Sequence, residues 1–264
     1  MNKPINQILG AAKLGSISQK ESYKLLSMLP EKEIYMIDTA PSYPKSELRI
    51  GEFMKLNNNC QIKVMTKFGR ETHPVTKQTL RASVHKSFER LRVDHIYGLT
   101  VHNRSETDIR NDVFDEILKL KAYGQISKFG WCGEWSNLPT NSLYNYDFVM
   151  LPVNPYVPNI KFLVDQIDVP LIAMNPFANF FWNYKEWSLV KKIINEKIFK
   201  KYNPRPNQYF TSKVNSPKSL NELIGFILKN GKIGSICFGS TRPDHVDEII
   251  DIIYQFYGVN RDLK

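Results

Sequence analysis

The sequence predicts an α/β protein that folds as a (β/α)8 TIM barrel. Eight short apolar segments rich in Ile, Val, Leu and Phe recur along the 264 residues, and segments with the apolar spacing of helices lie between most of them. A strand followed by a helix and a further strand favours right-handed crossovers and a parallel sheet, and eight such units can close into a barrel. A doubly wound open sheet is the alternative fold.

The predicted strands are spaced so that a helix fits between most neighbours. They cover residues 8–15, 34–40, 62–69, 95–102, 126–133, 147–154, 170–177 and 232–239. The predicted helices cover residues 19–29, 76–91, 106–123, 218–230 and 243–256. Ser18 followed by Glu21 predicts a capping box at the first helix, and Pro243 suits the first turn of the last one.

Residues 178–217 interrupt this alternation between the seventh and eighth strands. The segment is dense in aromatic residues and lysines, and its middle has helical periodicity. Long excursions in compact domains are usually functional lids or linkers, and this one is too aromatic for a linker. We therefore expect residues 1–264 to form a single domain with this insertion at the carboxyl-terminal face of the barrel. An inserted helix that only packs its aromatic side chains on the barrel is the alternative.

Composition narrows the classes of partner. Apolar residues make up 42% of the chain and charged residues 23%, which is typical of a globular protein. The net charge of +10 favours anionic partners such as nucleotides or phosphorylated metabolites. The sequence has no zinc-finger spacing, no RNP-like aromatic motif and no helix with a sustained basic face, so we do not expect a nucleic-acid partner. No sequence feature indicates an oligomeric state.

Location and cysteine content are both consistent with a cytoplasmic protein. The N-terminus lacks the apolar core of a signal peptide, and no run of about 18 apolar residues could span a bilayer, so no membrane partner is expected. Cys60, Cys132 and Cys237 are widely spaced and include no CxxC pair. We interpret them as reduced thiols, and we expect neither a disulfide framework nor a metal site.

Four polar residues follow the predicted second, third and fourth strands. Asp38 and Tyr43 lie around the end of the second strand, Lys67 at the end of the third and His102 at the end of the fourth. In a parallel barrel the carboxyl ends of the strands and the loops after them form the active site. We therefore expect these four side chains to meet.

Together these residues can deliver a proton to a carbonyl oxygen. A phenol has an unperturbed pKa of about 10, but a neighbouring ammonium favours the phenolate, and a carboxylate keeps that ammonium charged. Tyr43 backed by Lys67 and Asp38, with His102 as a second hydrogen-bond donor, suits this chemistry. Taken singly, the aspartate could be a turn former, the lysine a surface cation and the histidine structural.

The same segments resemble the aldo-keto reductase family. IDTAPSYPKSELRIG (37–51) resembles the family signature in which Asp-Thr-Ala leads to Tyr, then Ser-Glu, then Gly. VMTKFG (64–69) resembles the lysine strand, and SFERLRVDHIYGLTVHN (87–103) resembles the helix and the strand that ends in His. Further resemblances are ILGAAKLG (8–15), LKAYGQISKFGWC (120–132) and FGSTRPDHVDEII (238–250). The resemblance runs from about residue 8 to 254 and leaves only 178–217 unmatched.

The resemblance implies a barrel that binds a nicotinamide dinucleotide without a Rossmann fold and reduces aldehydes or ketones. It makes Tyr43 the general acid, Lys67 and Asp38 its tuning pair, and His102 the residue that orients the carbonyl. The cofactor-binding residues that it implies are Gly10, Ala11, Cys132, Met174, Gly239, Ser240, Thr241, Arg242 and Glu248.

The chain departs from the family pattern around the nicotinamide. Cys132 and Gly133 stand where the fifth strand usually ends in Ser-Asn, and Met174 stands where an aromatic residue usually stacks on the nicotinamide ring. The expected glutamine of the sixth strand is missing, and Phe180 falls on the glycine of a phosphate loop. By contrast, Arg242 and its neighbours keep the appearance of a pocket for the adenosine phosphate, which favours NADPH over NADH.

Two hypotheses fit this uneven resemblance. In the first, the chain is an NADPH-dependent carbonyl reductase whose nicotinamide rests on Met174 and on Trp131 or an aromatic residue of the insertion. In the second, the chain keeps the tetrad of Asp38, Tyr43, Lys67 and His102 but does not transfer hydride. It is then a non-redox acid/base enzyme or a nucleotide-binding regulatory module.

The substrate is expected to be a small-molecule carbonyl compound. The residues expected to line its pocket are Trp131, Trp135, Phe180 and Trp182. Basic residues of the insertion, from Lys191 to Arg205, suit a phosphorylated or nucleotide-linked sugar, because aromatic faces stack on bases and sugars while cations bind phosphate. Small aldehydes are the alternative substrate, and a solvated helix face is the alternative role of these cations.

Overall fold

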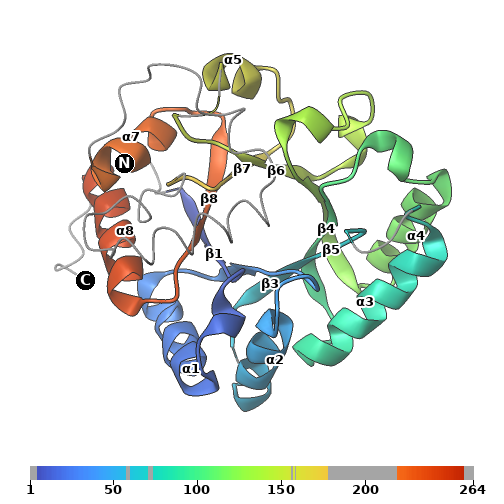
Figure 1. The fold of residues 1–264 in the computed structure, drawn as a ribbon, viewed down its shortest axis with the longest axis horizontal. Coiled ribbons are helices and arrows are strands. Elements are labelled where there is room, and N and C mark those ends of the chain that lie inside the picture. The colour runs from blue at the N-terminus through green and yellow to red at the C-terminus, as the bar shows by residue number, and fades with distance from the viewer. Residues whose placement is uncertain are drawn as a thin grey trace, which may run out of the picture.

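A computed structural model describes residues 5–57, 60–70, 74–155, 157, 159–177 and 219–258. Its eight parallel strands form a closed barrel in chain order, as Figure 1 shows in a view down the barrel. The strands are β1 (Asn6–Gly10), β2 (Met36–Asp38), β3 (Lys63–Phe68), β4 (Ile96–His102), β5 (Ile126–Cys132), β6 (Phe148–Pro152), β7 (Leu171–Met174) and β8 (Ile233–Gly239). β2 to β8 lie within the predicted segments, and β1 overlaps the first predicted segment, 8–15, only at residues 8–10. The barrel is confirmed, and the open-sheet alternative is wrong because β1 pairs with β8.

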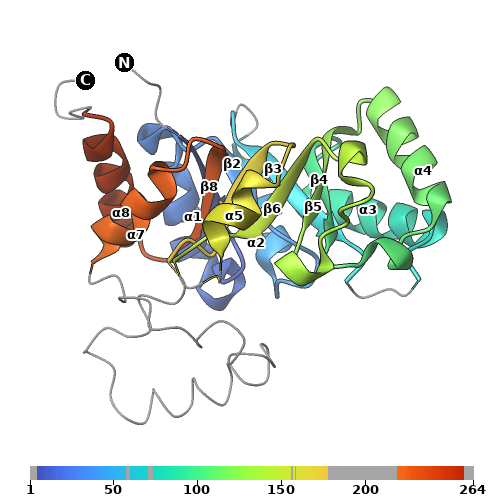
Figure 2. The ribbon, with the colours of Figure 1, turned by 90° about the horizontal axis from the view of Figure 1, so that it is seen from above.

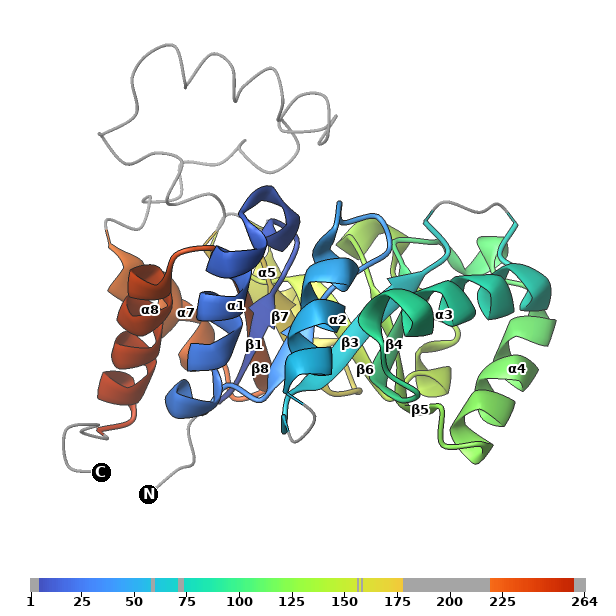
Figure 3. The ribbon, with the colours of Figure 1, turned by 90° about the horizontal axis from the view of Figure 1, so that it is seen from below.

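The helices surround the barrel. They are α1 (Gln19–Met28), α2 (Ser46–Leu56), α3 (Lys77–Leu91), α4 (Asn111–Ala122), α5 (Ile160–Asp165), α7 (Leu220–Leu228) and α8 (Pro243–Phe256). Figure 3 shows α8, α1, α2 and α3 in that order along one flank, and Figure 2 shows the flank that carries β6 and α5. None of the helices in these ranges is long and apolar enough to cross a bilayer.

Five of these helices match the predicted ones, and their ends follow the expected chemistry. The Ser18 hydroxyl accepts from the Glu21 backbone N–H at 3.2 Å, and the Glu21 carboxylate accepts from the Ser18 N–H at 2.8 Å. This reciprocal pair confirms the predicted capping box at α1. Pro243 occupies the first turn of α8, also as predicted.

The barrel interior is packed with sulfur-containing, aliphatic and aromatic side chains. Its buried members are Ile8, Met65, Cys132, Phe148, Met150, Ile172 and Cys237. Two glycines make room for the largest of them: a Cβ on Gly98 would lie 3.0 Å from the Met65 side chain, and one on Gly130 only 2.5 Å from the Phe148 ring. The interior is therefore a filled core, and chemistry is confined to its ends.

Candidate active site

Three of the four predicted catalytic side chains come from neighbouring strand ends. Asp38 is the last residue of β2, Lys67 lies near the end of β3, and His102 is the last residue of β4. The exposed fractions of these three residues are 5%, 1% and 7%. The β2–β3 and β3–β4 registers place Asp38 opposite Met65 and Lys67 opposite Thr100. Three polar side chains thus lie buried together at the carboxyl end of the barrel.

Lys67 forms a buried ion pair with Asp38. Its ammonium donates to the Asp38 carboxylate and to the Thr39 carbonyl oxygen, the latter at 2.9 Å. Burial lowers the pKa of Lys67, but Asp38, together with smaller contributions from Tyr43 and Cys132, outweighs burial and holds the pKa above its ordinary value. Lys67 therefore stays charged.

Tyr43 lies on the loop after β2 and completes the cluster. The Lys67 Nζ atom is 5.2 Å from the centre of the Tyr43 ring, and the Tyr43 and His102 ring centroids are 6.0 Å apart at an interplanar angle of 84°. The structure therefore brings all four predicted residues together, with the lysine over the Tyr43 ring and the histidine ring roughly perpendicular to it.

The pKa of Tyr43 shifts in the direction opposite to the expected one. Lys67 was expected to make the phenol more acidic, yet burial raises the pKa of Tyr43 above its ordinary value and the Lys67 ammonium offsets only part of that rise. The reason is that burial removes more hydration from a phenolate at this position than one nearby charge restores. Tyr43 is consequently protonated at neutral pH and can act as a proton donor.

His102 is held neutral. Burial lowers its pKa to about 2, with further contributions from the cations Lys67, Arg70 and Arg104. An Nη atom of Arg70 lies 3.4 Å from the His102 Nε2 atom. Because a guanidinium only donates, the ring nitrogen that faces Arg70 accepts, and the single proton of the neutral imidazole then resides on Nδ1.

Two further residues of the 37–51 signature, Thr39 and Ser46, hold the loop that carries Tyr43 in place. The Thr39 hydroxyl donates to Ser46 Oγ at 2.8 Å, and Ser46 Oγ donates to the Ala11 carbonyl oxygen at 2.8 Å, so one buried chain of hydrogen bonds links β2, α2 and the end of β1. A Cβ on Gly15 would lie 1.6 Å from the Pro44 carbonyl oxygen. Only glycine permits this contact, which supports the loop immediately after Tyr43.

A second set of contacts fixes α2 against β3 and α3. The Glu47 carboxylate, 2% exposed, accepts from the Thr66 hydroxyl at 2.7 Å and from Arg90 Nε at 2.6 Å. A Cβ on Gly51 would lie 2.1 Å from the Arg90 carbonyl oxygen, so this glycine allows α2 and α3 to approach closely. These residue types in the signature therefore have structural roles next to the catalytic ones.

The candidate cofactor residues of β1 and β8 lie beside Asp38. Gly10 pairs with Asp38 on one side and with Gly239 on the other. A Cβ on Gly10 would lie 3.3 Å from both the Cys237 sulfur and the Phe238 carbonyl oxygen, so this end of β1 is closely packed. Ala11 is 2% exposed, and its N–H donates to the Asp38 carbonyl oxygen at 2.8 Å.

Cys132 and Met174 form a sulfur pair at the ends of β5 and β7. The Cys132 thiol lies 3.8 Å from the Met174 sulfur, and Met174 is partly exposed. Burial raises the pKa of Cys132 to about 12, so the thiol is protonated. This pair offers an apolar, polarizable surface next to His102, which is opposite Cys132 in the β4–β5 register.

The predicted phosphate pocket is a preformed loop at the start of α8. Ser240 Oγ accepts from the Arg242 N–H at 3.0 Å, and the exposed Arg242 guanidinium forms a two-pronged contact with Asp244. Thr241 is partly exposed, and Glu248 is exposed one turn further along the helix. A helix N-terminus with an arginine and two hydroxyls fits an anionic phosphate, although Asp244 competes for the arginine.

Trp131 does not line an open pocket, which corrects the expectation for this residue. It is 0% exposed, and its indole N–H donates to the Arg104 carbonyl oxygen at 2.9 Å. Successive side chains of a strand alternate, and Cys132 faces the barrel interior, so Trp131 faces the surrounding helices. Trp135 is partly buried and donates to the Pro152 carbonyl oxygen at 2.7 Å. Phe180, Trp182 and the cations from Lys191 to Arg205 lie outside the described residues.

Two polar residues at this end of the barrel were missed by the sequence reasoning. Arg70 follows Lys67 by three residues and contacts His102, and its charge at a predicted strand end was the available signal. Asn154, 6% exposed, follows β6, and its amide donates to the Asn175 carbonyl oxygen at 3.1 Å. It supplies an amide near the position where the sixth strand lacks the expected glutamine.

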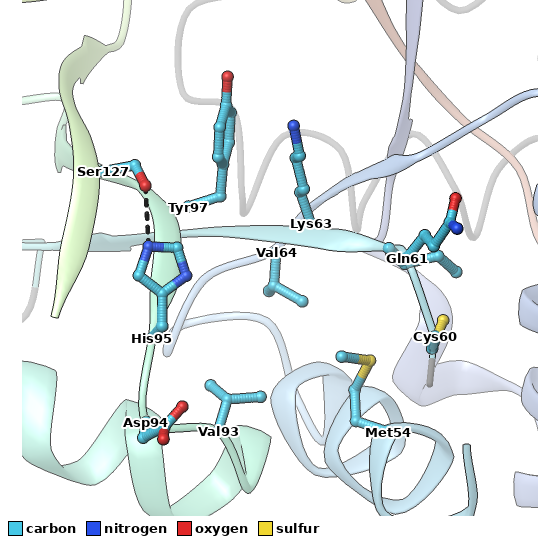
Figure 4. A pocket seen from close by; sticks show the side chains of 11 residues that line it. Met54, Cys60, Gln61, Lys63, Val64, Val93, Asp94, His95, Tyr97 and Ser127 are labelled. Atoms are coloured by element: carbon cyan, nitrogen blue, oxygen red, sulfur yellow. Dashed lines mark hydrogen bonds between the residues drawn. The ribbon is translucent and has the colours of Figure 1, made fainter. Parts of the chain in front are cut away.

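A cleft in the described part of the chain lies at the other end of the barrel. Figure 4 shows this cleft of about 460 Å³ at the amino ends of β3, β4 and β5. The Lys63 ammonium lies 4.8 Å from the centre of the Tyr97 ring, and the His95 Nε2 atom is 2.8 Å from Ser127 Oγ. Lys63 and Lys67 lie at opposite ends of β3, so this cleft is separate from the Tyr43 cluster.

Comparison with known proteins identifies the family of the chain. The model of the Aldo/keto reductase family matches residues 7–255. The chain belongs to the aldo/keto reductase family. D-threo-aldose 1-dehydrogenase from a Pseudomonas species is 26% identical over 179 residues, a match that covers 54% of this chain and 54% of that relative. The match therefore spans about half the length of the curated relative.

Solved structures of the family share the fold. A Pseudomonas aeruginosa protein assigned to the aldo-keto reductases superposes with a TM-score of 0.69 at 18% identity, over 94% of this chain and 90% of that one. The holo form of an aldo-keto reductase from Bacillus halodurans superposes with a TM-score of 0.70 at 17% identity, over 94% of this chain and 86% of that one. At such identities the likeness establishes the barrel fold alone.

Proposed function

We propose that this aldo/keto reductase family member reduces the carbonyl group of a small molecule, with a reduced nicotinamide dinucleotide as the hydride source. The observation that carries the proposal is the position of Tyr43, a protonated phenol beside the buried Lys67–Asp38 pair and the neutral His102. A positioned acid with a fixed cation behind it is what protonation of a carbonyl oxygen requires.

Tyr43, Lys67, Asp38 and His102 all act, directly or through Tyr43, on the carbonyl oxygen of the substrate. When bound, the reduced nicotinamide supplies the hydride that the carbonyl carbon receives. Tyr43 donates its proton to the carbonyl oxygen, which completes the alcohol, and the resulting phenolate is stabilised by the Lys67 ammonium until it takes a proton from solvent. Asp38 keeps Lys67 charged through this cycle, and His102 orients the carbonyl beside Tyr43.

NADPH is the proposed cofactor, with NADH less favoured. Ser240, Thr241 and Arg242 at the start of α8 would hold the additional phosphate, with Gly10, Gly239 and Glu248 along the same side of the barrel. Met174 and Cys132 would support the nicotinamide ring through their sulfur atoms. The carboxylate of Asp244 has to yield part of its contact with Arg242 to the incoming phosphate.

The proposed substrate class is an aldehyde or ketone. The name of the curated relative, D-threo-aldose 1-dehydrogenase, favours a sugar or a sugar-derived carbonyl compound. A phosphorylated or nucleotide-linked sugar was suggested by the cations of residues 178–217, which lie outside the described residues. Small aldehydes are the alternative.

A second function rests on the replaced nicotinamide contacts. Cys132 and Met174 occupy positions where the family resemblance implied Ser-Asn and an aromatic residue. A site altered in this way could retain the dinucleotide without transferring hydride, or could retain the acid/base tetrad without the dinucleotide.

One pair of measurements separates these functions. Protein fluorescence is titrated with NADPH and with NADH, and dinucleotide oxidation is followed in the presence of a panel of aldehydes and ketones. Saturable binding with carbonyl-dependent oxidation is the result expected of a reductase. Tight binding without oxidation supports a nucleotide-binding module, and absence of binding supports a non-redox acid/base enzyme.

A further inference from the structure

Arg70 is a cation next to the proposed active site. The mechanism described above does not use it. It follows β3, it is exposed, and its guanidinium lies 3.4 Å from the Nε2 atom of His102. The His102 ring in turn lies roughly perpendicular to the Tyr43 ring, with centroids 6.0 Å apart. A permanent positive charge therefore lies beside the place where the carbonyl oxygen is proposed to bind.

The backbone that carries Arg70 is held by a second arginine. Arg104 Nε donates to the Gly69 carbonyl oxygen at 2.6 Å, and an Nη atom of Arg104 donates to the Arg70 carbonyl oxygen at 2.7 Å. The Arg104 carbonyl oxygen accepts from the buried Trp131 indole at 2.9 Å. Gly69 has φ of +92°, a backbone conformation that favours glycine, and this turns the chain at Arg70. Contacts with Arg104 and Trp131, at the ends of β4 and β5, thus hold the backbone from which the Arg70 side chain extends.

The partners of Arg70 set it apart from other arginines of the chain. Arg81, Arg90, Arg92 and Arg242 each form an ion pair with a carboxylate. Among the described residues no carboxylate pairs with Arg70, and its one polar side-chain contact is with the neutral His102. A guanidinium has several N–H donors in one plane, so most of them remain available for a bound anion.

We propose that Arg70 binds the carboxylate of an oxo-acid substrate whose carbonyl group is reduced at Tyr43. This inference rests on the proposed reductase function and names its substrate class. An Nη atom of Arg70 and the Nε2 atom of His102 are 3.4 Å apart. Once Nε2 carries the imidazole proton, two oxygens bonded to these atoms at about 2.9 Å can belong to groups on adjacent or nearly adjacent carbon atoms. A 2-oxo or 3-oxo acid has this separation between its carbonyl and its carboxylate. Arginine also matches a carboxylate in a two-pronged geometry, which fixes the orientation of the substrate.

The contact between Arg70 and His102 couples binding of the carboxylate to orientation of the substrate carbonyl. While Arg70 donates to Nε2, that nitrogen cannot donate to a carbonyl oxygen. A carboxylate that draws the guanidinium toward itself releases Nε2, which can then carry the imidazole proton and donate to the carbonyl. A neutral carbonyl compound has no charge with which to move Arg70. The oxo acid should therefore gain in orientation as well as in binding.

The test compares acids with their neutral methyl esters. The probes are a panel of 2-oxo and 3-oxo acids, including phenylglyoxylate, each paired with its methyl ester. Binding is measured by isothermal titration to the full chain, and reduction by NADPH oxidation. The variants are R70Q, R70K and, as a matched control, R110Q, since Arg110 is an exposed arginine at the start of α4 with only a 3.7 Å contact to Asp112.

The wild-type chain and R110Q should bind at least one acid about 10- to 100-fold more tightly than its ester, the range expected of charge-assisted hydrogen bonds. R70Q should lose that preference, mainly through a higher KM for the acid. R70K should be intermediate, because lysine keeps the charge without the planar fork.

The outcomes separate this inference from the reductase proposal. If acids bind through Arg70 but neither acids nor esters are reduced, the reductase proposal fails and the carboxylate site stands. If esters and acids are reduced equally by the wild-type chain and by R70Q, the carboxylate site is refuted and the reductase stands. The inference is also refuted if no acid in the panel binds more tightly than its ester.

Discussion

The ammonium of Lys67 and the carboxylate of Asp38 form an ion pair that is almost entirely shielded from water. Removing one member of such a pair leaves an uncompensated buried charge, which costs about 3–5 kcal/mol. Replacing Asp38 by Asn should therefore lower the free energy of unfolding by that amount in urea denaturation. The exposed Arg92–Glu52 pair is the control, and Glu52→Gln should cost less than about 1 kcal/mol. Equal effects of both changes would show that the Lys67–Asp38 pair is not shielded as described.

Two helical glycines should respond in opposite directions to alanine. A Cβ at Gly51 would lie 2.1 Å from the Arg90 carbonyl oxygen, whereas a Cβ at Gly225 in α7 has no neighbour within 4 Å. Gly51→Ala should destabilise the protein by at least about 1–3 kcal/mol, because α2 and α3 have to separate. Gly225→Ala should stabilise it by up to about 1 kcal/mol through helix propensity. Thermal unfolding of both variants tests this contrast, and a stable Gly51→Ala protein would contradict the close approach.

The buried His102 should make stability depend on pH. Its pKa falls from an ordinary 6.5 to about 2 on folding, so between these values the unfolded chain binds more protons than the folded one. The stability that neutral His102 contributes is complete above pH about 6.5 and is lost as the pH falls through the acid range. Unfolding free energies measured from pH 3 to 7 should therefore fall less steeply on acidification in His102→Asn, by up to about 1.4 kcal/mol per pH unit. Parallel profiles would contradict the burial of His102.

Arg242 should discriminate between the two dinucleotides. Arg242→Ala should weaken NADPH binding at least about tenfold, because it removes a charge-assisted contact with the additional phosphate, and it should leave NADH nearly unchanged. Asp244→Asn should tighten NADPH binding, since the carboxylate no longer competes for Arg242. Fluorescence titration of both variants measures these effects. Equal losses for NADPH and NADH in Arg242→Ala would defeat the assignment of the phosphate pocket.

The sequence predicted the barrel well because its signal is local. Strands of a parallel barrel are buried on both faces and read as apolar runs, so seven strands fell within the expected segments and β1 overlapped its segment at residues 8–10. Helix α2 was missed because its buried face includes Ser46, Glu47 and Gly51 next to Ile50 and Phe53, a mixture that hides the apolar periodicity. Its polar members are buried through contacts with β3 and α3, which no local pattern reveals.

The site was predicted less completely. The meeting of Asp38, Lys67 and His102 followed from parallel strand ends alone. The outward direction of Trp131 follows from strand alternation once Cys132 is known to face inward, but which residue faces inward depends on the closed barrel. The raised pKa of Tyr43 depends on how much water the folded site excludes, which is a property of packing and not of the motif.

The lysine behind Tyr43 should act through the same proton as the phenol. Lys67→Met removes the charge that stabilises the phenolate, so its effect on carbonyl reduction should not add to that of Tyr43→Phe. The double variant should resemble the slower single variant in single-turnover reduction. Additive losses would mean that Lys67 and Tyr43 act in separate steps.

Carbonyl reduction by Tyr43→Phe tests the proposed role of Tyr43 most directly. The substitution removes one hydroxyl group, and Tyr123→Phe, at a tyrosine that is 78% exposed, is the matched control. If Tyr43 is the general acid, Tyr43→Phe should keep the unfolding midpoint and the NADPH affinity of the wild-type chain while the rate of reduction falls by about 10²- to 10⁴-fold, and Tyr123→Phe should reduce its substrate at the wild-type rate. Near-full reductase activity in Tyr43→Phe would contradict the assignment and leave residues 37–51 as a structural turn.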